Sequence, residues 1–182
     1  MSIGAPDSLE DEQRRLYDAI AHGPRAAGPQ HFALLDDRGV LNGPFNAFLL
    51  SPGLGQAVQA LGATIRYESS LSARVREVSI LRVAAHWDCE FEWHAHSAVA
   101  RALGLDREID AVREGRADEL DDAVERAALA AVGQLLAGGR YTEDEYDAVA
   151  SVLGERQLFE LSTLVGYYSM LALQLRLFDV SV

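Results

Sequence analysis

The 182-residue chain has little of several features that define whole classes of protein. It has one cysteine, Cys89, so neither a disulfide framework nor an intramolecular dithiol can form. Basic residues number 16 against 28 acidic ones, and the net charge of −12 argues against nucleic-acid and anionic-membrane partners. No apolar run approaches the ~20 residues of a membrane span. Because the N-terminus also lacks a signal-peptide pattern, we expect a cytoplasmic protein.

Sustained alternation of apolar and polar residues, the pattern of a strand, is also missing. Apolar residues recur instead at helical spacing, so the sequence predicts an all-α helical bundle in a single domain. Within it, residues 1–40 supply an N-terminal helix and an irregular lead-in, with one helical turn from His31 to Leu35, and residues 41–182 form one compact helical unit. The expected helices cover residues 7–21, 44–50, 52–67, 72–86, 88–103, 106–114, 118–137 and 142–177, the last interrupted at Gly154.

Capping residues define the expected helix ends. Asp7 or Ser8 is available to begin the first helix, and Ser72 and Asp88 are the predicted N-caps of the two helices in the middle of the chain. Gly104 suits the position just after a helix end, because glycine adopts the left-handed conformation found there. Thr142 followed by Glu145 and the pair Gly138-Gly139 give the same kind of signal, a capping box and a helix end.

Five polar residues lie in one otherwise apolar stretch, and they are the candidates for chemistry. Cys89, Glu92 and His96 are spaced three and four apart, which places them on one helical face. His86 continues that stripe only if the helix is unbroken through Asp88. Glu77 precedes Cys89 by twelve residues, about 1200° of helical rotation, so it must come from a separate or bent helix to join the others.

The residue types favour acid–base chemistry. Glu92 lies one turn from His96, so its carboxylate can orient the imidazole and raise its pKa, and such a pair suits proton transfer near neutral pH. Cys89 is expected in the first turn after an Asp88 cap, where backbone N–H groups and the helix dipole favour a thiolate. The acidic side chains of Glu90 and Glu92 oppose that effect by like-charge repulsion.

Other interpretations stand beside this one. Taken singly, a cysteine on a helix is more often a small buried apolar residue, and a histidine more often a hydrogen-bonded structural one. A zinc site from Cys89, Glu92 and His96 matches no zinc spacing and would need His86 as its fourth ligand, so we expect no metal. No serine lies in a Gly-x-Ser-x-Gly elbow, which argues against a serine hydrolase.

A group of motifs resembles one known family. They are Arg76 to Ala84, then Phe91-Glu92-Trp93-His94-Ala95-His96, then Ala100 to Gly104, preceded by Leu41 to Asn46 with Ser51-Pro52 and followed by Gly166-Tyr167-Tyr168. Their order and spacing resemble the carboxymuconolactone decarboxylase family, which also contains the AhpD-like alkylhydroperoxidases. The resemblance covers most of the chain from residue 41 onward. It implies an AhpD-like helical fold, assembly as a trimer or a dimer of trimers, and a small-molecule substrate.

The hydroperoxidase branch of that family uses a Cys-x-x-Cys pair, an upstream glutamate and a histidine four residues past the second cysteine, with three residues between them. By this resemblance Cys89 matches the first cysteine, His96 the histidine and Glu77 the glutamate, while Glu92 takes the place of the second cysteine. Without two thiols the ordinary peroxidase cycle cannot close. A single-cysteine peroxidase that uses an external thiol to resolve a Cys89 sulfenic acid is the alternative that remains.

The decarboxylase branch acts on a carboxylated muconolactone without metal or organic cofactor, and the sequence is more similar to it. Loss of CO₂ beside a lactone carbonyl needs a stabilised dienolate and then a proton donor to carbon. We therefore predict a cofactor-free lyase or isomerase in which His96 transfers the proton and Glu92 orients it. Glu77 is either a second acid–base group or an ion-pair partner of Arg76 or Arg82. We expect substrate contacts from His86, Trp93 and Phe45, and a non-catalytic helical scaffold is the third hypothesis.

Overall fold

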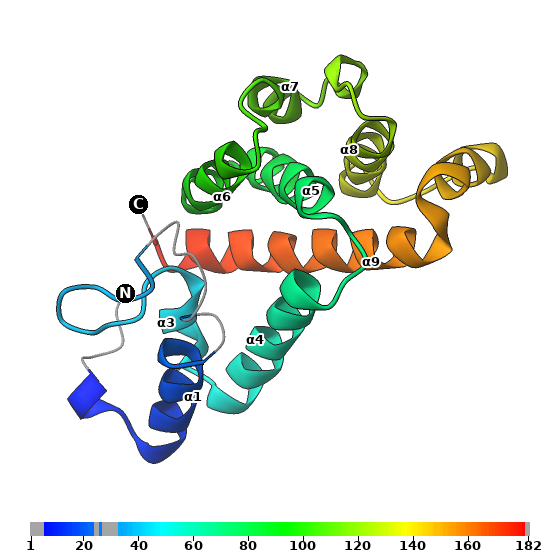
Figure 1. Ribbon diagram of the computed structural model, residues 1–182. Helices are drawn as coiled ribbons and strands as arrows, with labels where there is room; N and C mark the ends of the chain where they lie inside the picture. Colours follow the sequence, from blue (N-terminus) through cyan, green and yellow to red (C-terminus); the bar gives the residue numbers. More distant parts are fainter. Residues whose placement is uncertain (1–5, 24–25, 27–32, 181–182) are drawn as a thin grey trace. The chain divides into compact units, whose positions relative to one another are not determined.

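The computed structural model describes residues 6–23, 26 and 33–180 (Figure 1). Over this part of the chain it contains eight α-helices, two short 3-10 helices and one isolated β-bridge between Leu35 and Leu41, with no strand. The all-α prediction is confirmed. The elements are η1 (Pro6–Ser8), α1 (Asp11–Ala21), α3 (Pro44–Phe48), α4 (Pro52–Tyr67), α5 (Ala73–His86), α6 (Glu90–Ala102), α7 (Glu108–Glu114), η2 (Ala117–Glu119), α8 (Ala123–Leu136) and α9 (Glu143–Leu177).

The chain forms two compact units, which we describe one at a time. The first comprises Met1–Glu68 and Gln174–Val182, and the second Ser69–Leu173. The division after residue 40 that the sequence suggests stays a prediction. The helical turn expected from His31 begins outside the described residues, and residues 33–35 within them are not helical.

In the first unit, α1 and α3 both pack against α4. The contact requires a glycine at position 55, because an added Cβ would lie 2.4 Å from the carbonyl oxygen of Phe48 and 2.8 Å from Leu16 Cδ2. The start predicted for the first helix at Asp7 or Ser8 is wrong. Those residues form η1, and α1 begins four residues later because the backbone N–H of Glu10 donates to Gln13 Oε1 at 3.1 Å.

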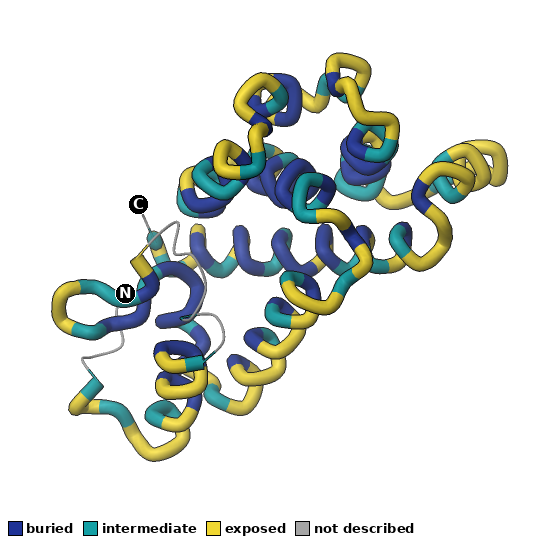
Figure 2. The backbone as a smooth tube through the Cα atoms, viewed as in Figure 1, coloured by how far each residue is buried: buried dark blue, intermediate teal, exposed yellow. Residues whose placement is uncertain are grey.

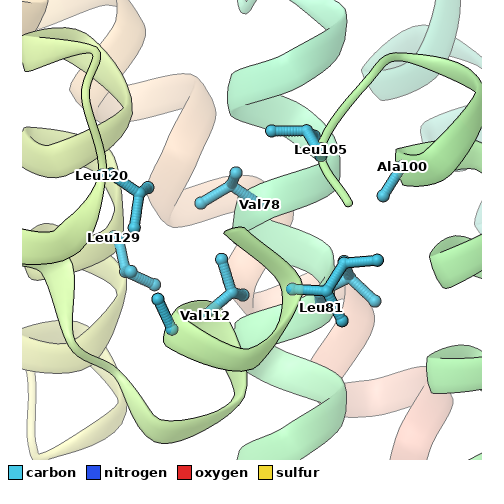
Figure 3. Close-up of a cluster of buried hydrophobic side chains, with 9 residues drawn as sticks. Val78, Leu81, Ala100, Leu105, Val112, Leu120 and Leu129 are labelled. Atoms are coloured by element: carbon cyan, nitrogen blue, oxygen red, sulfur yellow. The ribbon is translucent and has the colours of Figure 1, made fainter. Parts of the chain in front are cut away.

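In the second unit, α5 is the central helix and contacts α6, α7 and α8 (Figure 1). More than half of its residues are buried, as the dark segments of Figure 2 show. One side of it belongs to an apolar cluster whose residues come from α5, α6, α7, α8 and the loops between them (Figure 3). The cluster consists of Val78, Leu81, Ala100, Leu105, Ile109, Ala111, Val112, Leu120 and Leu129.

Arg74 ties these helices together at their ends. Its Nε donates to Glu125 Oε1 at 2.5 Å and Nη2 donates to Glu125 Oε2 at 3.2 Å, while Nη1 donates to the carbonyl of Leu103 at 3.0 Å. The guanidinium therefore joins α5 to α8 and to the end of α6, in the two-pronged geometry that gives arginine–carboxylate pairs their directionality. These hydrogen bonds of Arg74 fix the start of α5 beside the end of α6.

The two middle helices begin differently from one another. Ser72 caps α5 as expected, accepting from the N–H of Val75 at 3.2 Å. The prediction that Asp88 caps the next helix is wrong, because Asp88 has a φ of 49° in the turn and Cys89 is the N-cap residue of α6. The N–H of Cys89 donates instead to the carbonyl of Ala84 at 2.9 Å, which closes α5. Cys89 thus precedes the first turn of α6.

Among the later helix boundaries, one differs from the prediction and two agree with it. The helix expected from residue 118 begins at Ala123, because Asp122 accepts from the N–H groups of Val124 and Glu125 at 2.8 and 2.9 Å. The capping box of Thr142 and Glu145 is confirmed. So is the interruption at Gly154, whose φ of 77° and ψ of 153° break the long helix α9.

Candidate acid–base site

A histidine held between two carboxylates lies inside the second unit. His96 Nδ1 donates to Glu77 Oε2 at 2.6 Å, and on the other edge of the ring Nε2 lies 3.3 Å from Glu92 Oε2. All three residues are buried, with exposed fractions of 1% for Glu77, 4% for Glu92 and 6% for His96. The structure therefore brings together three of the residues that the sequence singled out.

A helical hairpin builds this arrangement. Only residues 87–89 separate α5 from α6, and so short a connection makes the two helices antiparallel neighbours. Glu77 lies about 14 Å before the end of α5 and His96 about 9 Å after the start of α6, at 1.5 Å per residue. The two side chains are consequently within about one turn of the same level. Glu92 joins them because it is one turn before His96 on the same face of α6.

The charges of the site explain the protonation state of His96. Burial of the ring lowers its pKa, but the charges of Glu77 and Glu92 and their hydrogen bonds to the ring outweigh that effect and raise the pKa to about 9. At neutral pH the ring is therefore an imidazolium. Carboxylates and an imidazolium that contact one another in a buried place stabilise one another, whereas a single buried charge would be costly.

The two contacts of the imidazolium are not equivalent. The 2.6 Å bond to Glu77 is short, as expected of a charge-assisted hydrogen bond, and it fixes the Nδ1 proton and the plane of the ring. The 3.3 Å contact to Glu92 is longer and weaker. Nε2 is thus the nitrogen better able to release or take a proton, and Glu77 has the orienting position that a carboxylate takes in a catalytic triad.

Arg76 lies beside this group. Its Nε is 3.7 Å from Glu77 Oε1, so the Glu77 carboxylate stands between a guanidinium and an imidazolium. The ion pair that the sequence offered as the alternative role of Glu77 is therefore present, and it coexists with the bond to His96. Arg82 is occupied elsewhere, because its Nη1 donates to the carbonyl of Arg113 at 3.1 Å.

Tyr168 of α9 is a site residue that sequence reasoning missed. Its ring meets the imidazole of His96 edge to face, with centroids 5.3 Å apart and an angle of 89° between the planes. Tyr167, its neighbour in the same motif, contacts Tyr168 edge to face with ring centroids 5.2 Å apart. The signal was the Gly166-Tyr167-Tyr168 motif, but nothing local indicates which tyrosine reaches a histidine 72 residues away.

The other predicted residues lie apart from the imidazole contacts. His86 is exposed at the end of α5, and its ring packs on Trp87. Trp93 packs against the apolar cluster, with the guanidinium carbon of Arg113 4.8 Å from its ring centroid. Phe45 belongs to the first unit, where it contacts Phe48. Their proposed role in substrate binding stays a prediction.

Cys89 is buried, with 4% of its surface exposed, at the N-cap of α6. Among the described residues, no three His, Cys, Asp or Glu side chains are grouped in a way that could hold a metal ion. Both ring nitrogens of His96 face carboxylates. Neither nitrogen therefore directs a lone pair toward a metal ion that the neighbouring side chains could share.

Comparison with known proteins agrees with the motifs. Residues 52–134 match the family model described as the carboxymuconolactone decarboxylase family. This stretch of the chain is similar to that family. It runs from the start of α4 into α8 and contains Glu77, Cys89, Glu92 and His96, whereas Tyr168 lies beyond it. The resemblance inferred from the sequence is thereby confirmed over residues 52–134, and the motifs at 41–46 and 166–168 lie outside the match.

No curated protein matches the chain. Over the described residues, no helix combines the length and the apolar character needed to cross a lipid bilayer.

Proposed function

We propose that this chain is a cofactor-free lyase of the carboxymuconolactone decarboxylase type, which decarboxylates or isomerises a small lactone-like carboxylic acid. The observation that carries the proposal is the buried imidazolium of His96 held between Glu77 and Glu92. A buried acid–base group with a strongly perturbed pKa is a frequent mark of a catalytic site. Similarity to the family model also favours a lyase or a peroxidase over other kinds of enzyme.

The proposed reaction needs one proton carrier. The carbon–carbon bond to the carboxylate breaks, its electron pair moves into the unsaturated lactone, and CO₂ leaves behind a dienolate. His96 then delivers the Nε2 proton to a ring carbon of the dienolate, and the neutral imidazole recovers a proton from solvent. Because its pKa is about 9, the histidine is in the donor form at neutral pH. Glu77 keeps the Nδ1 proton in place throughout.

The positive charge of His96 has a second use. A dienolate carries negative charge that the ground-state lactone lacks, and a fixed cation in a buried site stabilises that charge without rearrangement. Before the substrate binds, the Glu92 carboxylate partly neutralises the positive charge of His96, because it lies 3.3 Å from Nε2. We infer that the substrate displaces the weaker Glu92 contact and leaves the Glu77 bond intact.

A single-cysteine peroxidase is the alternative. Its support is the position of Cys89 at the N-cap of α6, because helix N-termini in general favour a thiolate, although the Cys89 side chain accepts no capping hydrogen bond. The burial of Cys89 and the carboxylate at position 92 speak against it, since the peroxide must reach the sulfur and an external thiol must resolve the sulfenic acid. By the family resemblance, the same proposal includes a homo-oligomer, a trimer or a dimer of trimers. From the sequence pattern we propose that it acts in the cytoplasm.

The test is ultraviolet monitoring of the purified protein with γ-carboxymuconolactone. We expect His96→Ala to lower turnover by about 10²- to 10⁴-fold, the usual contribution of a positioned acid or base. His94→Ala is the matched control, because His94 is exposed on the same helix, and it should keep full activity. Cys89→Ser should also stay active if the protein is a lyase.

The other outcomes are equally clear. Full turnover by a folded His96→Ala variant would contradict the proposed mechanism. Thiol-dependent peroxide reduction that Cys89→Ser abolishes, without lactone turnover, would favour the peroxidase. A folded wild-type protein that performs neither reaction would be a helical scaffold, or an enzyme acting on another acid.

A further inference from the structure

The helix α9 has an exposed face without charge. Residues 161–175 contain no charged side chain, although 24% of the chain is charged. Phe159 is 72% exposed and Leu173 is 50% exposed, and Ser162 and Gly166 between them are exposed as well. A helix of a soluble protein that lacks charge on every side is usually buried on every side. The exposed side of α9 is therefore a candidate contact surface.

Helical periodicity gathers these residues on one side of α9. At 100° per residue, Ser162, Gly166 and Leu173 lie within about 60° of Phe159 around the helix axis. Tyr168, which belongs to the candidate site, lies about 180° away on the buried side. We call the exposed side the neutral face, and it consists of Phe159, Ser162, Thr163, Gly166, Met170 and Leu173.

Gly166, at the middle of the neutral face, is not required by the packing of its own chain. Its φ is not positive, and an added Cβ would meet no neighbouring element among the described residues within 4 Å. Glycine inside a helix destabilises it relative to alanine. The benefit of glycine at an exposed helical position is that another backbone can approach closely. The position of Gly166 thus indicates a second helix packed across this face.

The two hydroxyl groups of the neutral face are satisfied within α9. The hydroxyl of Ser162 donates to the carbonyl of Phe159 at 2.8 Å, and that of Thr163 donates to the same carbonyl at 3.0 Å. A buried polar group is costly only when it lacks a hydrogen bond. These hydroxyls can therefore lose contact with water without leaving a donor unpaired, so the neutral face suits a dry interface.

The neutral face is complementary to itself. Phe159 lies seven residues before Gly166 and Leu173 seven residues after it, while Ser162 and Met170 lie four residues to either side. A two-fold axis at Gly166 consequently sets Phe159 of one copy against Leu173 of its antiparallel partner, with glycine meeting glycine between them. Two chains that each carry −12 also approach with least repulsion through an uncharged face.

We propose that α9 packs antiparallel against α9 of a second copy of this chain, about a two-fold axis at Gly166. The contact goes beyond the reaction proposed above and does not depend on it. It also lies outside residues 52–134, the stretch that matches the family model. A single pair of helices makes a small interface, so we expect a dissociation constant in the micromolar range.

Sedimentation velocity of the whole chain over a range of concentrations tests the contact. Gly166→Glu places bulk and two like charges at the axis, so we expect a dissociation constant at least about a hundredfold higher. The number of copies should halve, from dimer to monomer or from a dimer of trimers to trimers. The variant should fold, because the added side chain meets open space in the single chain, and circular dichroism verifies this.

Gly133→Glu is the matched control. Gly133 lies on α8, where an added Cβ also meets no neighbouring element within 4 Å, so the same substitution there should leave the number of copies unchanged. Added salt is a second control. It should strengthen the association of the wild-type protein, because it screens the repulsion between two negative chains and the neutral face has no ion pair to weaken.

Cross-linking tests the antiparallel direction. Phe159→Cys and Leu173→Cys, each in a Cys89→Ser background, are mixed and treated with a short bis-maleimide that spans the ~8–10 Å between packed helices. We expect links between the two variants. Phe159→Cys alone should give few links, because its two copies would lie about 21 Å apart along the helix axis.

Three results would overturn the proposal. They are a wild-type protein that stays monomeric at every concentration, a folded Gly166→Glu variant that keeps the wild-type number of copies, and Phe159→Cys alone linking as well as the mixture. Lactone turnover is a separate outcome. An inactive protein whose assembly is halved by Gly166→Glu would reject the lyase and keep the interface, whereas an active protein with unchanged assembly would do the reverse.

Discussion

The second unit contains two buried regions that use the same pair of helices in opposite ways. The apolar cluster takes Val78 and Leu81 from α5 and Ala100 from α6, and it consists of hydrocarbon alone (Figure 3). The acid–base site takes Glu77 from α5 and His96 from α6, and it consists of charges. Both are shielded from water to a similar degree.

The difference lies in what each region requires from its members. Burial of an apolar side chain stabilises the folded state in rough proportion to the area removed from water. The contribution of each apolar residue is therefore largely independent of the others. Buried charges are stable only as a set, because removal of one partner leaves the others unpaired. Damage to the cluster should therefore affect stability alone, whereas damage to the site should affect stability and chemistry together.

The largest effect is expected from Glu77→Gln, which removes the charge that fixes His96 Nδ1. We expect turnover of the lactone acid to fall by about 10²- to 10⁴-fold, as for the loss of an acid–base group. The pKa of His96 should also fall, because its principal charge partner is gone. Steady-state kinetics and an NMR titration of His96 measure the two effects. Glu90→Gln, an exposed acid in the first turn of α6, is the control and should alter neither.

Next in size is Leu129→Ala, which opens a cavity in the apolar cluster. Leu129 is 1% exposed, and such truncations cost about 2–5 kcal/mol in free energy of unfolding. Urea denaturation should show this loss, while kcat of the folded protein stays at the wild-type value. If kcat dropped as strongly as it does in Glu77→Gln, the two regions would not be independent and the comparison would break down.

The pH dependence of stability should come from the site and not from the cluster. The folded pKa of His96, about 9, lies above the unfolded value of 6.5, so its contribution is complete below pH 6.5 and is lost as pH rises through 9. The loss is on the order of 3 kcal/mol. Urea denaturation from pH 6 to 10 should show it in the wild-type protein. The same fall in His96→Gln would assign it to another group.

The smallest effect is expected from Tyr168→Leu, which removes the ring that meets the imidazole edge to face. Aromatic pairs of this kind contribute about 0.5–1.5 kcal/mol beyond their buried area. We therefore expect a decrease in kcat of about three- to tenfold, since looser positioning of the ring affects the chemical step. Tyr168→Phe keeps the ring and should stay within about twofold of wild type, unless the hydroxyl itself takes part.

Local chemistry made much of this fold predictable from the sequence. Ser72, Thr142 and Gly154 define helix ends through their own side chains or backbone, and each was assigned correctly. Asp88 was assigned wrongly because a short polar side chain suits both an N-cap and a left-handed turn, and the three-residue connection selected the turn. The signal preceding residue 123 was ambiguous for a similar reason, since several acidic residues compete there to cap the helix.

The site was predictable in part. The spacing of Glu92 and His96 placed them on one face of a helix, and family resemblance supplied Glu77. That Glu77 takes the shorter bond and Glu92 the longer one depends on how α5 packs against α6, which no periodicity specifies. Tyr168 depends on the path of α9 through the unit, so it could be found only in three dimensions.

The three-residue connection between α5 and α6 has a consequence for how the site comes into being. Glu77 and His96 are 19 positions apart, and a single helical hairpin carries both, together with Glu92. Closing so short a loop costs little chain entropy, and contacts that are local in sequence form early and fast. The charged set is thus carried by one short piece of chain, whereas the ring of Tyr168 comes from α9, 72 residues beyond His96.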